Sequence, residues 1–285
     1  MAEQHPLKKY RANCHCAAYI FEVNLPDTIE SGLRCNCSYC YKRAGIFQLP
    51  QSEGDITFEK GDPATLARYS FGNVEHQFCL TCGTYLFRVD GKIYVNLRAI
   101  QNFNVWNLDT QPIEGISSLP GWTPPKFNGL EPPAEIESAK IYTGGCHCGA
   151  VTIALKSTPI DSTYDAPLVE CNCSICNRNG YLWIYPSKSQ VSVVGTGSMG
   201  HYSFGRGIWR KTFCRTCGVP IHNHIDDYTP EQIAALPEHL RQWTTEHLEW
   251  SPVNVRALDG VNLGELNVRR VDGWGAPGRL EYTNP

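Results

Sequence analysis

The amino-acid sequence predicts a mainly β protein made of two tandem units, and three observations lead to this prediction. The 14 cysteines of the 285-residue chain fall into two sets of seven, with the same order and nearly the same spacing. Short runs rich in β-branched residues, bounded by Gly, Pro or Ser, recur along the chain. The 25 glycines and 19 prolines indicate many turns, which argues against a helical bundle or a coiled coil.

The cysteine sets define an internal repeat. Each set consists of a CxC, a CxCxxC and a CxxCG motif, and the second copies follow the first by 132, 136 and 135 residues, respectively. Chance does not produce seven nearly constant offsets, so we infer a duplication. The first set is Cys14, Cys16, Cys35, Cys37, Cys40, Cys79 and Cys82, and the second is Cys146, Cys148, Cys171, Cys173, Cys176, Cys214 and Cys217.

Segments outside the cysteine motifs repeat as well. Tyr69–Gly72 and Tyr202–Gly205 both read YSFG, and Val95–Ala99 matches Val253–Ala257. The latter pair is 158 residues apart, so the second unit carries an insertion of 23 residues (158 minus 135) after its CxxCG motif. Strands are predicted at residues 93–97, 151–155 and 191–194.

The insertion, at about residues 225–248, is predicted to be helical. It opens with Thr229 as N-cap, followed by a Pro at the first helical position and a capping-box Gln, which predicts a helix over residues 230–236. Pro237 ends this helix, and a second short helix follows through Trp243 or beyond. We interpret the insertion as surface decoration, with a lid over a site as the alternative.

A Pro-rich stretch between Pro112 and Pro133 joins the two units and is typical of an ordered linker. We therefore predict a first domain at residues 1–138 and a second at residues 139–285. No stretch approaches the ~20 apolar residues of a membrane span, and the N-terminus lacks the apolar segment of a signal peptide. We expect a cytoplasmic protein with no membrane partner.

The cysteines are predicted to bind metal. A cytosolic chain of this length does not need disulfides, and a reducing compartment would not keep them. Zinc takes thiolates in tetrahedral sets, in which four close a structural site and three leave a catalytic position open. Seven cysteines per unit fit one site of each kind, with CxC joined to CxxCG and with CxCxxC as the open site. Spacing alone does not prove this partition, and iron or structural zinc throughout are alternatives.

The motifs resemble those of the glutathione-dependent formaldehyde-activating enzyme family, which includes the centromere protein V domain. The resemblance rests on Gly144–Val151 (GGCHCGAV), Cys171–Cys176 (CNCSIC) and Phe213–Gly218 (FCRTCG), and it covers nearly the whole chain as two tandem copies. It implies two zinc-binding domains of the β-tent type, with up to two Zn²⁺ ions per unit and four per chain.

The resemblance also implies a role for every cysteine. The structural ligands would be Cys14, Cys16, Cys79 and Cys82 in the first unit and Cys146, Cys148, Cys214 and Cys217 in the second. The catalytic, open-site ligands would be Cys35, Cys37 and Cys40 in the first unit and Cys171, Cys173 and Cys176 in the second. The implied activity is carbon–sulfur bond making or breaking, as in condensing glutathione with formaldehyde to S-hydroxymethylglutathione or cleaving a glutathione conjugate. A substrate thiol would take the open metal position, with glutathione as co-substrate.

The first unit departs from the family pattern around its CxC motif. It has Ala12-Asn13 where the second unit has Gly144-Gly145, and Ala17 where the second has Gly149. Asn tolerates a left-handed backbone, so we expect the turn to be kept. All seven cysteines are present, so we expect intact metal sites and rank the second unit as the better catalyst.

Cationic and aromatic side chains are candidates for contacts with glutathione, which has two carboxylates. The predicted glutathione-binding residues are Arg206 and Arg256, and the further candidates are Arg98, Arg210 and Lys211. The aromatic candidates for shielding the open site are Tyr181, Trp183 and Trp209. Solvated surface charge and aromatic core packing are the simpler interpretations of these two groups.

The histidines near the cysteine motifs receive structural interpretations. His15 and His147 lie between ligand cysteines, where the alternation of side chains points them away from the metal. His222 and His224 form an HxH pair after the second CxxCG motif, but two imidazoles alone do not complete a zinc site. His222 aligns with Phe87, so this pair is not repeated in the first unit.

A zinc-dependent carbon–sulfur lyase or synthase is therefore the leading functional hypothesis. The alternative is a non-catalytic, zinc-stabilised module that docks a protein partner, and the three cysteines left over in each unit argue against it. Nucleic-acid binding is the weakest hypothesis, because the formal net charge is −3 and no run of Lys or Arg occurs. The sequence leaves the true substrate and the oligomeric state open.

Overall fold

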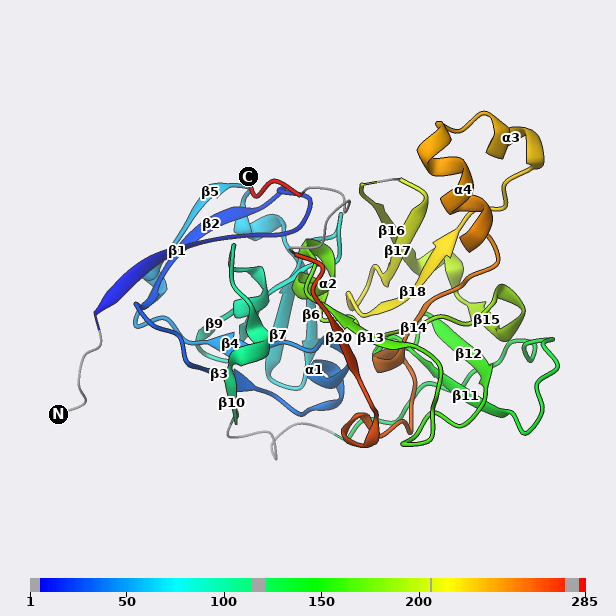
Figure 1. The fold of residues 1–285 in the computed structure, drawn as a ribbon. Helices are drawn as coiled ribbons and strands as arrows, with labels where there is room; N and C mark the ends of the chain where they lie inside the picture. Colours follow the sequence, from blue (N-terminus) through cyan, green and yellow to red (C-terminus); the bar gives the residue numbers. More distant parts are fainter. Residues whose placement is uncertain (1–5, 114–120, 206, 275–281) are drawn as a thin grey trace.

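A computed structural model describes residues 6–113, 121–205, 207–274 and 282–285 and shows a mainly β chain built from two units of the same topology (Figure 1). Each unit combines a three-stranded sheet with a seven-stranded sheet, and the strand orders of the two units match. The predicted fold class and the tandem repeat are confirmed. The exact boundary after residue 138 stays a prediction.

The three-stranded sheets are antiparallel, and the CxC motif of each unit lies in the turn between its first two strands. The predicted strand at 151–155 begins one residue later, and the one at 191–194 is found as predicted. The strands, in sheet order, are β1 (Leu7–Asn13), β2 (Ile20–Pro26) and β5 (Ile56–Lys60) in the first unit and β11 (Lys140–Gly145), β12 (Thr152–Ser157) and β15 (Val191–Val194) in the second.

The seven-stranded sheets each begin with one parallel pair, and the CxxCG motif forms the turn between two of their antiparallel strands. In the first unit the order is β10 (Asp109–Pro112), β3 (Ser31–Arg34), β4 (Phe47–Gln48), β9 (Ile93–Asn96), β8 (Tyr85–Val89), β7 (Val74–Phe78) and β6 (Ala67–Phe71). In the second it is β20 (Arg269–Val271), β13 (Leu168–Cys171), β14 (Trp183–Ile184), β19 (Val253–Asn254), β18 (Pro220–Ile225), β17 (Trp209–Cys214) and β16 (Met199–Ser203).

Two short helices begin inside the CxCxxC motifs, α1 (Ser38–Arg43) and α2 (Ser174–Asn179). The thiol of Cys37 caps α1 by accepting a hydrogen bond from the backbone N–H of Cys40 (3.4 Å). Both helices end on a left-handed residue, Ala44 (φ 50°) and Gly180 (φ 61°). The sharp turn at each helix end limits the helices to six residues. Cys40 and Cys176 lie in the first helical turn, and Cys37 and Cys173 are the N-caps.

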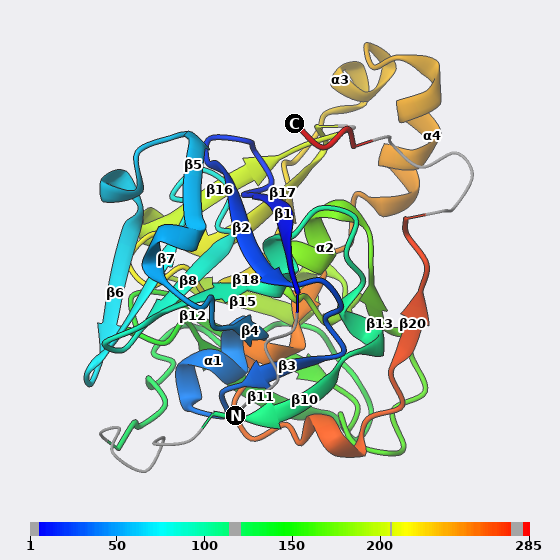
Figure 2. The same ribbon diagram turned by 90° about the vertical axis from the view of Figure 1, so that its left-hand side faces the viewer.

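The insertion forms α3 (Pro230–Ala234) and α4 (Glu238–His247), as predicted, although α3 ends two residues earlier than expected. Thr229 and Gln232 form the predicted capping box. Figures 1 and 2 both place these helices at the edge of the molecule, away from α2, as expected of surface decoration. No helix among the described residues has the length and apolar character needed to cross a membrane.

The two units share a continuous buried core. One cluster of buried side chains includes Tyr39 and Tyr85 of the first unit together with Val151 and Ile221 of the second. The glycines of the CxxCG motifs lie at this boundary, both with a left-handed backbone. A Cβ atom would lie 3.0 Å from the ring of Phe213 at Gly83 (φ 72°) and 2.9 Å from the ring of Phe78 at Gly218 (φ 71°). Each motif therefore packs its glycine against the other unit, where a side chain would not fit.

Candidate metal centres

Four groups of cysteines come together, and within each group all sulfur atoms lie within 4.8 Å of one another. The groups are those expected from the motifs and implied by the family resemblance, with CxC joined to CxxCG and with CxCxxC by itself. The four-cysteine clusters are Cys14, Cys16, Cys79 and Cys82 and, in the second unit, Cys146, Cys148, Cys214 and Cys217. The three-cysteine clusters are Cys35, Cys37 and Cys40 and, in the second unit, Cys171, Cys173 and Cys176.

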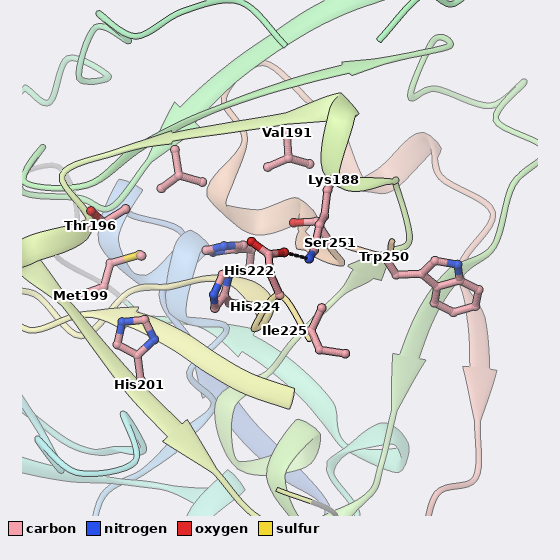
Figure 3. A pocket seen from close by; sticks show the side chains of 12 residues that line it. Lys188, Val191, Thr196, Met199, His201, His222, His224, Ile225, Trp250 and Ser251 are labelled. Atoms are coloured by element: carbon pink, nitrogen blue, oxygen red, sulfur yellow. Dashed lines mark hydrogen bonds and ion pairs between the residues drawn. The ribbon is translucent and has the colours of Figure 1, made fainter. Parts of the chain in front are cut away.

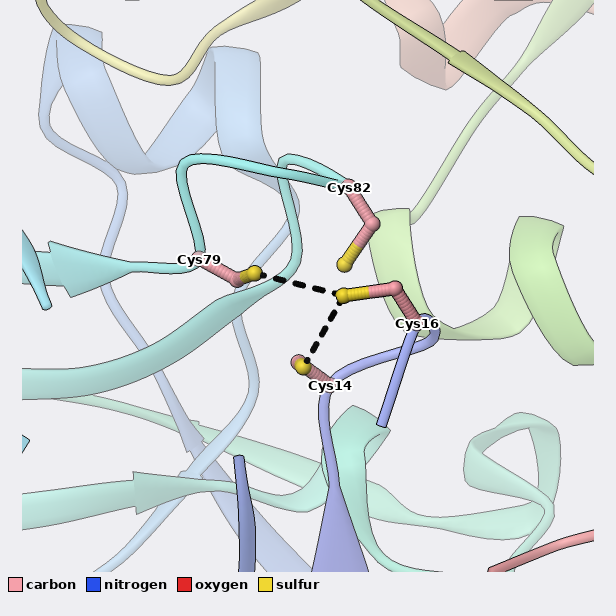
Figure 4. Close-up of side chains that lie close together, drawn as sticks. All are labelled: Cys14, Cys16, Cys79 and Cys82. Atoms are coloured by element: carbon pink, nitrogen blue, oxygen red, sulfur yellow. Dashed lines mark hydrogen bonds between the residues drawn. The ribbon is translucent and has the colours of Figure 1, made fainter. Parts of the chain in front are cut away.

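The four-cysteine clusters have the dimensions of a tetrahedral thiolate site. In the first unit the Sγ atom of Cys16 lies 3.6 Å from those of Cys14 and Cys79 (Figure 4). In the second unit the Sγ atom of Cys148 lies 3.5 Å from that of Cys146 and 3.6 Å from that of Cys214. A tetrahedral zinc with bonds of about 2.3 Å needs sulfur atoms about 3.8 Å apart. These donor sets therefore fit zinc.

Each three-cysteine cluster comes from one six-residue loop and helix turn. Its ligands therefore approach a metal from one side only, which leaves a position for a further ligand. Hydrogen bonds with Cys37 and Cys40 hold the pKa of the Cys35 thiol well below its ordinary value. The first cluster is buried, whereas Cys173 of the second is only partly buried. The second site is therefore the more accessible of the two.

Polar side chains surround the first three-cysteine cluster. His76 is fully buried, its ring stacks on Tyr39 at 3.9 Å between centroids, and its Nδ1 pairs with the hydroxyl of Tyr85. Arg88, the cross-strand neighbour of His76, lies near the thiol of Cys35 and lowers its pKa. The Nε2 atom of His76 and the Nε atom of Arg88 have no hydrogen-bond partner among the described residues. No motif in the sequence marks either residue, and their only signal is their place in two alternating strands.

Aromatic side chains surround the second three-cysteine cluster. Two of the three aromatic candidates for shielding the open site are Tyr181 and Trp183. Both are buried in one apolar cluster with Cys171 and Cys176. Lys211 lies over the Trp183 ring, 5.2 Å from its centroid. The repeat aligns Lys211 with His76, so the two sites differ at this position.

The third aromatic candidate, Trp209, lies against the insertion and not against these cysteines. Its ring centroid is 5.7 Å from that of Trp243 and 6.4 Å from that of His247, both in α4. The contact explains how α4 is held on β17. The insertion therefore supplies the aromatic partners of Trp209.

The arginines that recur in the repeat bind the ends of the two helices. The Nε atom of Arg98 donates to the carbonyl of Ala44 (2.7 Å), and that of Arg256 donates to the carbonyl of Gly180 (3.1 Å). Burial lowers the pKa of both guanidinium groups. Arg210 pairs with the carboxylate of Asp226.

These contacts bear on the predicted glutathione-binding residues. Arg256 uses part of its guanidinium to hold the end of α2, and its contact with glutathione stays a prediction. Arg206 lies outside the described residues.

The turn after the first CxC motif is kept, with Ala17 (φ 59°) in the left-handed conformation of Gly149 (φ 81°). The residue with the left-handed backbone is therefore Ala17 and not Asn13, which is the last residue of β1.

The HxH pair lines a pocket of about 360 Å³ between the sheets of the second unit (Figure 3). Among the described residues, the groups able to hold an ion all consist of cysteine, so the pair completes no metal site. His222 bonds Thr212 Oγ1 through its Nδ1 (2.8 Å), and burial lowers its pKa to about 3. The pocket is lined by Lys188, Val191, Val193, Thr196, Met199, His201, His222, His224, Ile225, Asp227, Trp250 and Ser251.

The first unit fills the same place with aromatic rings. Phe87 and Phe58, which align with His222 and Val193, pack with Phe21 at centroid distances of 4.9 and 5.3 Å. The double change His222→Phe and Val193→Phe should therefore close the pocket and raise the free energy of unfolding by about 1–2 kcal/mol. Chemical denaturation of the metal-loaded chain measures this difference. The reverse change Phe87→His should lower stability, and a less stable double variant would show that the second core cannot accept the rings.

Comparison with known proteins agrees with the repeat and its motifs. The sequence profile of the glutathione-dependent formaldehyde-activating enzyme family matches twice, at residues 9–109 and 141–248. A crystal structure of a Rhodobacter sphaeroides protein shares 30% sequence identity, with a TM-score of 0.34, and the match covers 45% of this chain and 99% of that one. The family matches span more than half of the chain and include all 14 cysteines. The chain therefore belongs to the glutathione-dependent formaldehyde-activating enzyme family.

Proposed function

We propose that the chain is a zinc-dependent carbon–sulfur lyase or synthase that acts on thiol adducts of glutathione. The observation that carries this proposal is the pair of three-cysteine clusters, which stand apart from the four-cysteine clusters in both units. A protein scaffold needs only closed metal sites, and here each unit keeps a second, incomplete donor set. The name of the family, which mentions glutathione and formaldehyde, supports the same substrate class.

The chemistry requires a thiol to be held as thiolate next to an electrophilic carbon. Zinc bound to three thiolates would supply this by binding and deprotonating a substrate thiol at its fourth position. In the synthase direction the sulfur of glutathione adds to the aldehyde carbon, so that a C–S bond forms and the C=O π bond opens. The thiol proton ends on the new hydroxyl oxygen. The lyase direction is the reverse.

The side chains around each cluster have separate tasks in this proposal. Tyr181 and Trp183 exclude water from the second site, which strengthens electrostatic interactions there. In the first site, the buried nitrogen atoms of His76 and Arg88 can hydrogen-bond the oxygen of the adduct. Arg256 and Arg206 are proposed contacts for the glutathione carboxylates.

The decisive variants are Cys37→Ser, Cys173→Ser and their combination. Each single change should remove one zinc ion and the turnover of one unit, and the combination should reduce exchange between formaldehyde and S-hydroxymethylglutathione to the uncatalysed rate. Exchange NMR with ¹³C-formaldehyde measures this rate, metal analysis counts the zinc, and circular dichroism checks the fold.

Two outcomes separate this proposal from its alternative. A double variant that still accelerates exchange would contradict the role of the three-cysteine clusters. A zinc-loaded natural chain without acceleration, whose cobalt-substituted spectrum does not change with glutathione, would favour the protein-docking module.

A further inference from the structure

His15, the residue between the two cysteines of the first CxC motif, reaches out of its own unit into the second. Its Nδ1 atom lies 2.8 Å from the hydroxyl of Tyr202, and its Nε2 atom lies 3.0 Å from Oγ of Ser174. Because a hydroxyl group can both donate and accept, both ring nitrogens can form these hydrogen bonds at the same time.

His147 makes the same contacts in the opposite direction. Its Nδ1 atom lies 2.7 Å from the hydroxyl of Tyr69, and its Nε2 atom lies 2.9 Å from Oγ of Ser38, both in the first unit. These residues occupy the positions of Tyr202 and Ser174 in the repeat. One arrangement of three side chains is thus formed twice, each time across the boundary between the units.

Aromatic rings enclose each histidine. The partners of His15 are Tyr282 (4.3 Å between centroids, stacked) and Phe204 (4.5 Å, edge-on), and those of His147 are Trp122 (4.9 Å, stacked) and Phe71 (4.7 Å, edge-on). The stacked partners also donate to the backbone carbonyl of the histidine that they cover, Tyr282 through its hydroxyl (2.8 Å) and Trp122 through its indole N–H (3.0 Å). Each ring is therefore fixed in position on several sides.

The serines that these rings hold belong to the three-cysteine clusters. Ser38 lies between Cys37 and Cys40 and is the first residue of α1, and Ser174 has the same place in α2. A contact to this serine fixes the turn from which two of the three thiols project. Groups that orient metal ligands from outside the coordination sphere commonly control metal affinity.

We propose that His147 positions the three-cysteine cluster of the first unit and that His15 positions that of the second. The proposal rests on the proposed function only in that these clusters bind metal. Its consequence is a crossed dependence, in which a change in the CxC motif of one unit alters metal binding in the other. A histidine that served only its own unit would act instead on the four-cysteine cluster beside it.

The experiment uses two reporter chains, each with one three-cysteine cluster. The Cys173→Ser chain keeps the cluster of the first unit, and the Cys37→Ser chain keeps that of the second. Each is loaded with cobalt, and the spectrum of the double variant Cys37→Ser/Cys173→Ser is subtracted, so that the difference reports the remaining cluster. Each histidine is then changed to Phe, which keeps a ring and removes both hydrogen bonds.

In the Cys173→Ser chain, His147→Phe should weaken cobalt binding at the remaining cluster by about 10- to 100-fold. His15→Phe should leave it unchanged there. In the Cys37→Ser chain the two effects should be exchanged. Ser38→Ala and Ser174→Ala should each weaken the cluster to which they belong, because they remove one end of the same contacts.

A histidine variant that weakens the cluster of its own unit, or both clusters equally, would overturn the proposal. Retention of cobalt in the four-cysteine clusters of the same chains shows that their fold is intact. If neither reporter chain binds more cobalt than the double variant, the proposed function fails together with this inference. Cobalt binding without the crossed pattern refutes only the inference.

Discussion

Removing the metal from the two four-cysteine clusters is expected to unfold both units of the chain. Each cluster joins the turn of a three-stranded sheet to the turn of a seven-stranded sheet. In the first unit, the joined residues Cys14 and Cys82 are 68 positions apart (82 minus 14). Structural zinc contributes on the order of 10 kcal/mol in zinc-finger peptides. Domains are stable by only about 5–15 kcal/mol, so the loss of two such sites exceeds what the core can offset.

The measurement is thermal unfolding by circular dichroism, with and without a strong chelator. The control is the double variant Cys37→Ser/Cys173→Ser, which lacks only the three-cysteine clusters. Its Tm should stay close to that of the natural chain, because Cys35 and Cys40 are only five positions apart (40 minus 35), so a metal bound there closes a very short loop. A chelated natural chain with an unchanged Tm would show that the sheets hold together without metal.

Replacing Arg43 by Ala is expected to lower the free energy of unfolding by about 3–5 kcal/mol. Arg43 is 2% exposed and donates to two buried carbonyls, those of Gly83 in the first unit and Gly218 in the second. Its guanidinium also lies 5.1 Å from the centroid of the Tyr85 ring. The truncation would leave a cavity and two carbonyls without their donors, at the point where both CxxCG motifs meet.

Chemical denaturation of the metal-loaded chain measures the loss. Arg43→Met separates its two sources, because Met restores most of the volume but donates no hydrogen bond. We expect Arg43→Met to recover part of the stability and Arg241→Ala, on the exposed face of α4, to change it by less than about 0.5 kcal/mol. An Arg43→Ala chain as stable as the natural one would show that the carbonyls find other donors.

The grouping of the cysteines could be predicted from the sequence, because the repeated motifs favour this partition and the family resemblance implies it. The helical insertion could also be predicted, since Thr229 and Pro237 act on the backbone next to them. The strand positions followed from local β-branched runs, with ends displaced by a residue or two.

The contacts between the units could not be predicted in this way. The alternation of side chains correctly predicted that His15 and His147 point away from the cysteine clusters. Their hydrogen-bond partners, however, depend on how the two units pack. A signal was present in the repeated YSFG segments, whose Tyr and Phe contact these histidines. Unless the packing of the units is known, no sequence pattern connects Tyr69 with His147, which lies 78 positions away.

The crossed contacts have the form of an interface in a homodimer with two-fold symmetry, where residue i meets residue j and j meets i. In such a dimer both active sites are encoded once and must stay identical. A fused, duplicated chain keeps the interface and loses that constraint. His76 and Arg88 of the first unit stand where the second has Lys211 and Asn223, so this chain holds two unlike sites that depend on one another for their shape. A single chain thus carries, between its two units, an interface of the kind that otherwise joins two separate subunits.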